Sequence, residues 1–472
     1  MSTLAPFALE MGLGGMLLIV FVASLLARGE DRRVIGWLAT LGVLALAIAS
    51  AFVRPAPPAL GGMFAQDGLA IFAKRLFLVA TFIGLLAGLS LPDRVFARRA
   101  GEYHLLLLAS LLGMLVLASA RDLLLLFLAF ELMSIPLYVL TGFLKREAIA
   151  VEASLKFFLV GSVSSAVLAY GLSFVYGATG TTDLAKIATA APGAGPLLTL
   201  GLIATLAGFA FKIAAFPFHM WVPDTYEAAS TPFVAWLSVT PKAAGFVALF
   251  RVFFEGAGDR ATGWMPVAAL LALLTMLAGN LMALPQQNTK RLLAYSGIAQ
   301  IGYMLVGVAA TSASGTAMVL FYLVAYVFGN MGAFLVVEAL ARAEGSESTT
   351  ALRGLAQRSP LLALAMLLFL LSLGGIPFVA GFWAKLYVFW AAAERGLYWL
   401  VLLGALLTVV ALFYYLLLAK RMYIEEPERQ GRVPVAPTLA ISLLLCALGV
   451  VARGLYPKGV VMAALRVATP LF

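Results

Sequence analysis

Long, continuous apolar stretches leave this chain few possible folds. Fourteen of them, each long enough to cross a bilayer as a helix, are separated by short polar breaks: 4–26, 34–53, 68–90, 102–119, 122–144, 150–176, 196–220, 230–254, 264–284, 290–310, 314–341, 360–392, 397–423 and 434–453. A helix needs about 20 apolar residues to span the roughly 30 Å hydrocarbon core. With 63% hydrophobic and 11% charged residues, a water-soluble protein of this size could not bury so much apolar surface.

The same stretches favour helices over strands. They show no alternation of apolar and polar residues, and backbone groups in lipid must find hydrogen bonds within their own segment. We therefore expect an all-α, polytopic membrane protein with about 14 transmembrane helices. The expected organisation is a single membrane domain, with peripheral helices in 1–101, a first helical repeat in 102–254, a second in 264–423 and a last helix in 434–453.

Charge and cysteine content exclude several classes of protein. The net charge of +10 is what loops facing an anionic leaflet would carry, so it does not indicate a nucleic-acid partner. Cys446 is the single cysteine, which excludes an intrachain disulfide or an iron–sulfur cluster. His104 and His219 lie far apart without metal-ligand spacing. We expect no metal and no cofactor in this chain.

The basic residues predict the orientation in the membrane. Odd-numbered connections between the helices hold 17 Lys and Arg residues, whereas even-numbered connections and the C-terminal tail hold 8. Because loops rich in Lys and Arg stay in the cytoplasm, both termini should face the periplasm of a bacterial inner membrane. The first stretch lacks a basic start and is too long for a cleaved signal peptide, so we read it as a helix.

Ionisable residues deep inside apolar stretches are the main functional signal. They are Glu131, Lys156, Lys212, Lys242 and Lys385. Each costs about 2.5–3.5 kcal/mol at the bilayer centre on insertion scales, so a role is expected, and moving protons or cations is the simplest one. Lys74, Arg75 and Arg251 also lie within the stretches but near helix ends, where long side chains can reach the surface.

Two stretches carry residues that interrupt a helix beside a lysine. Pro217 follows Lys212 by five positions and should open the helix just after the lysine. The second stretch places Gly374, Gly375 and Pro377 before Lys385. Two interrupted helices in corresponding positions are typical of transporters built from inverted repeats, and the freed carbonyls need polar partners. His219, at the end of the first such stretch, is a secondary candidate for relaying protons.

The remaining candidates have both functional and structural interpretations. Glu131 can exchange protons with a buried lysine, or it can form an ion pair that joins two helices. Lys156 lies four residues after Glu152, so a local pair on one helix is a close alternative to proton transfer. Secondary polar candidates that share a helix face are Ser296, Gln300 and Tyr303. They can hold a chain of waters or simply bond between helices.

Several segments resemble the antiporter-like membrane subunits of respiratory complex I, most closely the subunit N type. The segments are Leu128–Pro136, Phe211–Pro232, Ser238–Gly245, Asn288–Gly307 and Arg358–Lys385. The resemblance covers the fourth to fourteenth predicted helices. It implies that Glu131 is the acid paired with Lys212, that Lys242 is a central lysine, and that Lys385 lies toward the outer exit. Lys156 matches a further lysine of this subunit type, and relatives often carry a histidine where Gln300 stands.

The resemblance also implies an activity and its partners. The expected function is proton translocation driven by NADH oxidation and quinone reduction, with NADH, FMN, iron–sulfur clusters and quinone held by other subunits. The expected partners are membrane subunits similar to subunits M and K, and the lipid bilayer. The alternatives are a subunit of a multisubunit cation/proton antiporter, a membrane arm of a hydrogenase- or ferredoxin-linked complex, and a structural spacer with inert ion pairs.

Overall fold

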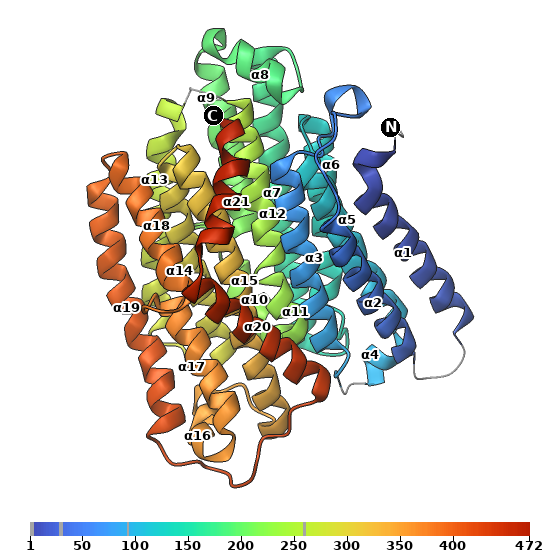
Figure 1. Cartoon of the computed structure of the whole chain (residues 1–472), viewed down its shortest axis with the longest axis vertical. Helices are drawn as coiled ribbons and strands as arrows, with labels where there is room; N and C mark the ends of the chain where they lie inside the picture. The colour runs from blue at the N-terminus through green and yellow to red at the C-terminus, as the bar shows by residue number, and fades with distance from the viewer. Residues whose placement is uncertain (1–3, 28–31, 92–93, 258–260) are drawn as a thin grey trace. The chain divides into compact units, whose positions relative to one another are not determined.

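The fold is built from membrane-length helices joined by short connections (Figure 1). The computed structural model describes residues 4–27, 32–91, 94–257 and 261–472. Within these ranges, 13 helices are long and apolar enough to cross a membrane, and extended backbone occurs only as isolated bridges. The predicted stretch 360–392 is the exception, because it forms two shorter helices. The expectation of an all-α, multi-pass membrane protein is confirmed.

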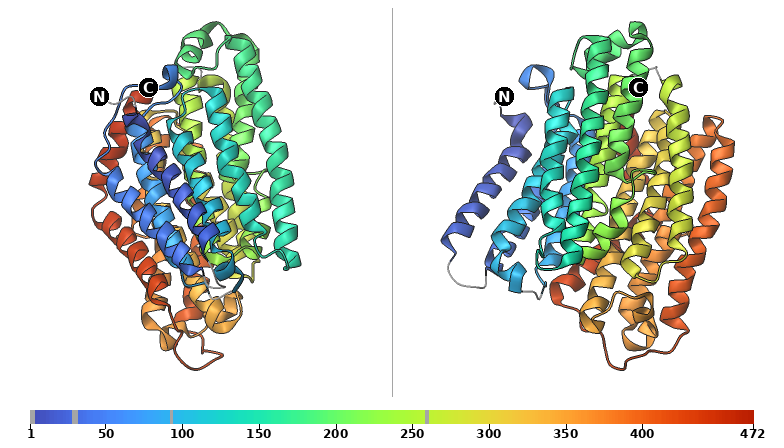
Figure 2. Two further views of the ribbon diagram at one scale, coloured as in Figure 1. Left: turned by 90° about the vertical axis from the view of Figure 1, so that its right-hand side faces the viewer. Right: turned by 180° about the vertical axis from the view of Figure 1, so that it is seen from behind.

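The chain forms two compact units, and each of them is built from segments that are discontinuous in the sequence. Unit 1 comprises 1–213, 240–264 and 466–472. Its helices are α1 (Ala8–Leu26), α2 (Arg33–Ser50), α3 (Gly68–Gly88), α4 (Arg94–Arg98), α5 (Ala100–Ser119), α6 (Leu123–Thr141), α7 (Ala148–Thr179), α8 (Leu184–Ala190), α9 (Gly195–Ile213) and α12 (Thr240–Phe250), which continues as a π-helix over Arg251–Gly256. Within this unit α7 and α9 run side by side (Figure 2).

Unit 2 comprises 214–239 and 265–465. Its helices are α10 (Trp221–Ala228), α11 (Thr231–Leu237), α13 (Ala261–Ala283, from residue 265 onward), α14 (Thr289–Ala309), α15 (Ala313–Glu344), α16 (Leu355–Arg358), α17 (Pro360–Gly374), α18 (Ala380–Glu394), α19 (Tyr398–Tyr423) and α20 (Pro437–Leu455). The boundary between the units falls within α21 (Lys458–Ala468). Short 3-10 helices cover Ala5–Phe7, Leu60–Gly62, Ala191–Gly193, Thr349–Leu352 and Thr469–Leu471.

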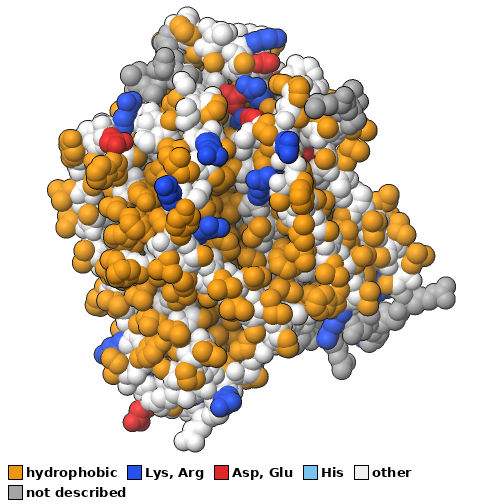
Figure 3. Space-filling model, in the orientation of Figure 1, with side chains coloured by type: hydrophobic (Ala, Val, Ile, Leu, Met, Phe, Trp, Pro, Cys, Tyr) orange, Lys and Arg blue, Asp and Glu red, His pale blue; other side chains and the backbone are white. Residues whose placement is uncertain are grey.

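Apolar side chains face outward as well as inward. Hydrophobic residues cover most of the face drawn in Figure 3, and many large ones are exposed along α1, α7, α19 and α20. A water-soluble protein rarely shows such a continuous apolar surface, whereas contact with lipid requires it. By contrast, α14 and α15, which belong to unit 2, are almost completely buried.

The same packing contact occurs once in each unit. A Cβ atom on Gly113 of α5 would lie 2.4 Å from the backbone nitrogen of Met133 in α6. The equivalent distance from Gly279 of α13 to the backbone nitrogen of Ala299 in α14 is 2.3 Å, and each contact pairs residues that are 20 positions apart. Only glycine permits two helix backbones to approach so closely. The N-terminal cap of the second helix also recurs, as Asp122 before α6 and Asn288 before α14.

The side chain of Lys74 in α3 points inward, contrary to the expectation that it reaches the surface. It is fully buried, and its Nζ lies 2.6 Å from Glu10 Oε1 of α1 and donates to Gln66 Oε1 at 2.5 Å. A lysine near a helix end turns inward when a buried carboxylate is in reach, because the pair neutralises both charges. Arg75 is exposed as expected, and it donates to the carbonyl of Ser50 at the end of α2.

The expectation that Arg251 reaches the surface is also wrong. Its guanidinium is fully buried and donates to both carboxylate oxygens of Asp67, at 2.6 and 2.7 Å. It also bonds Glu255 at 2.9 Å and the carbonyl of Ala118. The contact with Asp67 is bidentate, which is the favoured geometry between a guanidinium and a carboxylate. Through these bonds the arginine links α5 and the π-helical segment to the start of α3.

Candidate functional site

The first predicted break lies where the sequence places it. Helix α9 ends at Ile213, one residue after Lys212, and the next helix begins only at Trp221. Ala214 adopts a left-handed backbone with φ of 64°, which ends the helical hydrogen bonding. The break also coincides with the point where the chain passes from unit 1 to unit 2. Lys212 is therefore the last polar side chain before the helix opens.

In unit 1, Lys212 is held by a hydroxyl group instead of a carboxylate. Its Nζ donates to Ser134 Oγ of α6 at 2.8 Å and lies 5.4 Å from the ring centroid of Phe130. Glu131, on the same helix, accepts a hydrogen bond from Ser165 Oγ of α7 at 2.5 Å. Within the described ranges no ion pair joins Glu131 to Lys212, although the two groups interact electrostatically. The predicted pair is thus close but not in direct contact.

Lys242 lies in the first turn of α12 and is buried in unit 1. Helix α12 packs against α9, and a Cβ atom on Gly245 would lie 3.6 Å from Cγ of Lys212. Because Gly245 is one turn after Lys242, the two lysines belong to one buried region. Unit 1 therefore brings together three of the predicted groups, namely Glu131, Lys212 and Lys242.

Lys156 is placed differently from the other lysines. Its side chain is 49% exposed on α7 and forms an ion pair with Glu152 at 2.8 Å. This is the local i, i+4 pair that the sequence offered as the alternative reading. The structure does not bring Lys156 to the buried lysines of unit 1.

The second break lies in unit 2. Helix α17 ends at Gly374 and α18 begins at Ala380, so the backbone is open between them as predicted. The carbonyl of Gly374 accepts a hydrogen bond from Lys385 Nζ at 3.3 Å, and the carbonyl of Leu373 accepts one from Gln300 Nε2 at 3.0 Å. The Lys385 ammonium also lies 4.4 Å from the ring centroid of Tyr303. Two carbonyls freed by the break are therefore satisfied by the predicted residues.

A continuous chain of polar side chains runs through the interior of unit 2. Ser296 Oγ lies 2.5 Å from the hydroxyl of Tyr415, which accepts from Gln300 Nε2 at 3.1 Å. The hydroxyl of Tyr322 donates to Gln300 Oε1 at 2.6 Å. Sequence reasoning missed Tyr322 and Tyr415, because a tyrosine in an apolar stretch looks like a core residue. Neither tyrosine carries a local sequence signal, because its polar partners come from another helix, α14.

A second polar group in unit 2 is centred on Asn280. Its Nδ2 donates to the hydroxyl of Tyr303 at 3.2 Å, and its Oδ1 accepts from the hydroxyl of Tyr414 at 3.1 Å. His219 is buried on the segment after the first break, with its ring 5.5 Å from that of Phe216. No group of three His, Cys, Asp or Glu residues that could hold a metal occurs in the part of the chain that the structure describes.

The lysines beside the two breaks share one property. Among the described residues, neither Lys212 nor Lys385 forms an ion pair with an acidic side chain, whereas Lys74, Lys156 and Lys290 each do. Buried lysines beside interrupted helices, held by neutral partners, are features of membrane proteins that move ions. The fold and this site define that class of protein.

Comparisons with known proteins identify the family. Residues 120–411 match the family of the NADH:quinone oxidoreductase/Mrp antiporter transmembrane region. The NADH-quinone oxidoreductase subunit N of Moorella thermoacetica is 42% identical over the full length of both chains. The chain therefore belongs to this family.

Solved structures agree with this assignment. A chain of respiratory complex I from Thermus thermophilus with bound aureothin has a TM-score of 0.84 and 34% identity, with 97% of this chain and 99% of that chain covered. A chain of the Mrp complex from Dietzia sp. DQ12-45-1b has a TM-score of 0.89 at 23% identity, with 100% of this chain and 98% of that chain covered. The second likeness shows the fold alone.

Proposed function

We propose that this chain is the subunit N type membrane subunit of a proton-translocating NADH:quinone oxidoreductase. The observation that carries the proposal is full-length identity of 42% to a subunit N, combined with buried lysines beside both helix breaks. In this role the chain contains no redox centre. NADH, FMN, iron–sulfur clusters and quinone belong to other subunits, and the neighbours in the membrane are similar to subunits M and K. The membrane is the bacterial inner membrane, with both termini in the periplasm.

The relay that we propose uses Glu131, Lys212, Lys242 and Lys385. A lysine held by a hydroxyl or a carbonyl keeps its hydrogen bond in both the charged and the neutral state, because ammonium and amine can both donate. A direct carboxylate partner would favour the charged state strongly and would hold the proton in place. Ser134 and the carbonyl of Gly374 thus permit proton release at Lys212 and Lys385.

Electrostatic coupling between neighbouring titratable groups sets the direction of proton transfer. Protonation of one buried group changes the proton affinity of the next, since Coulomb interactions are strong where water is scarce. A charge change in the adjoining subunit would therefore move protons along the relay. Lys156, His219 and the row of Ser296, Gln300 and Tyr303 are secondary members in this proposal. Because glutamine does not titrate, Gln300 would orient hydroxyl groups or water instead of carrying a proton.

The test is a set of alanine variants in the intact complex. Lys212→Ala, Glu131→Ala and Lys385→Ala should each reduce proton pumping per NADH oxidised, whereas Lys420→Ala, at an exposed site on α19, should not. Pumping is measured in reconstituted vesicles with a pH-sensitive dye, and assembly is checked on native gels. Normal pumping in all three assembled variants would refute the relay. Lys156→Ala measures whether an exposed, paired lysine contributes.

A cation/proton antiporter subunit is the alternative function, because the family that matches residues 120–411 includes Mrp antiporters as well as NADH:quinone oxidoreductases. Vesicles containing the complex would then exchange sodium for protons without NADH. We expect no such exchange, because the identity to a subunit N is 42% whereas the identity to the Mrp chain, over the same length, is 23%.

A further inference from the structure

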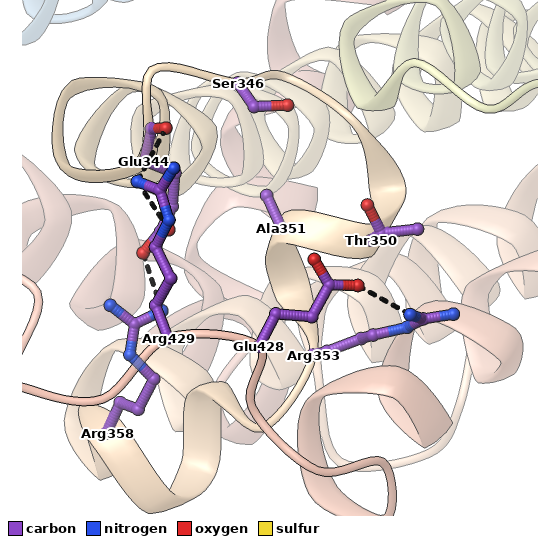
Figure 4. Close-up of a pocket in the computed structure, with 8 residues that line it drawn as sticks. All are labelled: Glu344, Ser346, Thr350, Ala351, Arg353, Arg358, Glu428 and Arg429. Carbon is purple, nitrogen blue, oxygen red and sulfur yellow. Dashed lines mark hydrogen bonds and ion pairs between the residues drawn. The ribbon is translucent and has the colours of Figure 1, made fainter.

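One end of unit 2 carries a dense group of charged side chains. The connections 342–359 and 420–433 hold seven Lys and Arg residues against five Glu residues. Residues from both connections line a polar pocket of about 80 Å³, which is drawn in Figure 4. The pocket lies near the start of α17, because Arg358, which lines it, is two residues before that helix.

Most charges in this pocket neutralise one another. Glu344 lies 2.6 Å from Arg358 and 3.5 Å from Arg429, so a single carboxylate faces two guanidinium groups (Figure 4). Arg353 forms ion pairs with Glu425 and Glu428. The group at Glu344 thus carries one positive charge too many and the group at Arg353 one negative charge too many, while the two connections together keep an excess of two positive charges.

This excess is accessible at the surface. The side chain of Arg429 is 64% exposed, although it also touches Glu344. Arg432 is exposed and has no hydrogen-bond or ion-pair partner among the residues that the structure describes. Guanidinium groups bind phosphate oxygens through two parallel hydrogen bonds, so these two side chains suit a phosphate group.

An apolar groove begins next to these arginines. It lies between α17 and α20, has a volume of about 470 Å³, and is lined by leucine, alanine and valine side chains, including Leu361, Leu364, Leu444 and Ala447. This volume falls within the range of about 300–1,000 Å³ that is typical of small-molecule sites. The lining contains no charged residue.

Backbone contacts connect the charged pocket to the groove. Arg358 Nε donates to the carbonyl of Gly431 at 3.0 Å, and the amide of Val433 donates to Ser359 Oγ at 3.0 Å. Leu361 and Val435, each two or three residues further along, already line the groove. The arginines thus stand where the apolar groove opens.

We propose that this combined surface binds an anionic phospholipid, with its phosphate at Arg429 and Arg432 and an acyl chain in the groove between α17 and α20. Charge complementarity selects this occupant. A phospholipid places an anion directly beside a long apolar chain, and the surface offers an arginine pair directly beside an apolar groove. A transmembrane helix would instead be held by small and polar contacts, whereas leucine predominates here. A free phosphate would leave the groove empty.

Lipid binding to the purified complex tests whether Arg429 and Arg432 hold the phosphate of the head group. The variant Arg429→Gln with Arg432→Gln should bind added phosphatidylglycerol about 30-fold more weakly, as expected for the loss of two basic side chains near an anionic head group. The matched control, Arg453→Gln with Lys458→Gln, removes one charge in the last turn of α20 and one just after it, at the opposite end of the helix, and should bind like the wild type. Native mass spectrometry of the delipidated complex measures the bound lipid. Equal binding by both double variants, or equal affinity for phosphatidylcholine, would overturn the proposal.

A second measurement tests the groove and does not depend on proton pumping. Ala447→Phe should reduce retained phosphatidylglycerol by filling the groove, whereas Leu448→Phe, which points away from it, should not. A photoreactive benzoylphenylalanine at position 444 of the assembled complex should give a lipid adduct. An adduct with another protein subunit at this position would show that a protein covers the groove and would refute the proposal.

Discussion

The buried pair of Lys74 and Glu10 offers a sharp test of how charge is tolerated in this chain. Lys74 Nζ lies 2.6 Å from Glu10 Oε1 and donates to Gln66 at 2.5 Å, and its side chain is fully buried. Because this lysine has a direct carboxylate partner, we expect the ion pair to stabilise the position of α1 beside α3 and to take no part in proton transfer. Lys74→Met and Glu10→Leu remove one partner each.

The size of the effect follows from the burial of both groups. Removing one partner leaves a buried charge uncompensated, which costs about 3–5 kcal/mol. The double variant removes both charges and leaves only Gln66 Oε1 without its donor, which costs about 1–3 kcal/mol. The losses in the free energy of unfolding of the two single variants should therefore not sum to that of the double variant. The double variant should be more stable than either single variant.

Titration of the purified complex with SDS in mixed micelles measures this difference. Unfolding of the chain is followed by limited proteolysis and quantitative mass spectrometry of its peptides. The double variant should also pump protons like the wild type. Stability in Lys74→Met equal to that of the wild type, or additive losses in the double variant, would refute the assignment of a structural pair.

Two further predictions concern single polar groups. Gln300→Leu should lower proton pumping and complex yield, because the carbonyl of Leu373 and the hydroxyl of Tyr322 lose their partner at about 1–3 kcal/mol each, although the hydroxyl of Tyr415 keeps Ser296. Gln300→His should retain more of both pumping and yield. For Asp67, burial raises the pKa, but the Arg251 guanidinium outweighs this and holds that pKa below its usual value of 3.8. Asp67→Asn should therefore destabilise the chain at neutral pH. The difference should disappear as the pH falls below 3.8 through the lower pKa of the folded protein, which SDS titrations at several pH values would show.

The helix breaks could be predicted because their cause is local. Pro217 and the Gly374–Pro377 segment disrupt helical hydrogen bonding whatever surrounds them, and the structure opens at both. The partners of the freed groups depend on other helices and could be predicted only in part. Gln300 was identified from its helix face, whereas Tyr415 comes from a distant stretch that carries no local signal.

Two basic residues near helix ends were predicted to reach the surface, and both predictions were wrong. Lys74 and Arg251 lie near helix ends, where the usual expectation is contact with water or head groups. Each instead meets a carboxylate from a different helix, Glu10 and Asp67 respectively. Sequence alone does not reveal which helices are neighbours, so these pairs could not be found from spacing. An acidic residue in the first apolar stretch was the one available signal for the first pair.

The contact between Lys385 and the end of α17 links charge to backbone geometry. Helix carbonyls at a C-terminus carry partial negative charge, and a cation at that point stabilises the last turn. This stabilisation is mutual, since thermodynamic linkage makes the two effects equal in size. If Lys385 exchanges protons as proposed, a neighbouring subunit that displaces the last turn of α17 would therefore change the proton occupancy of its amine. Conversely, protonation of the amine would stabilise that turn.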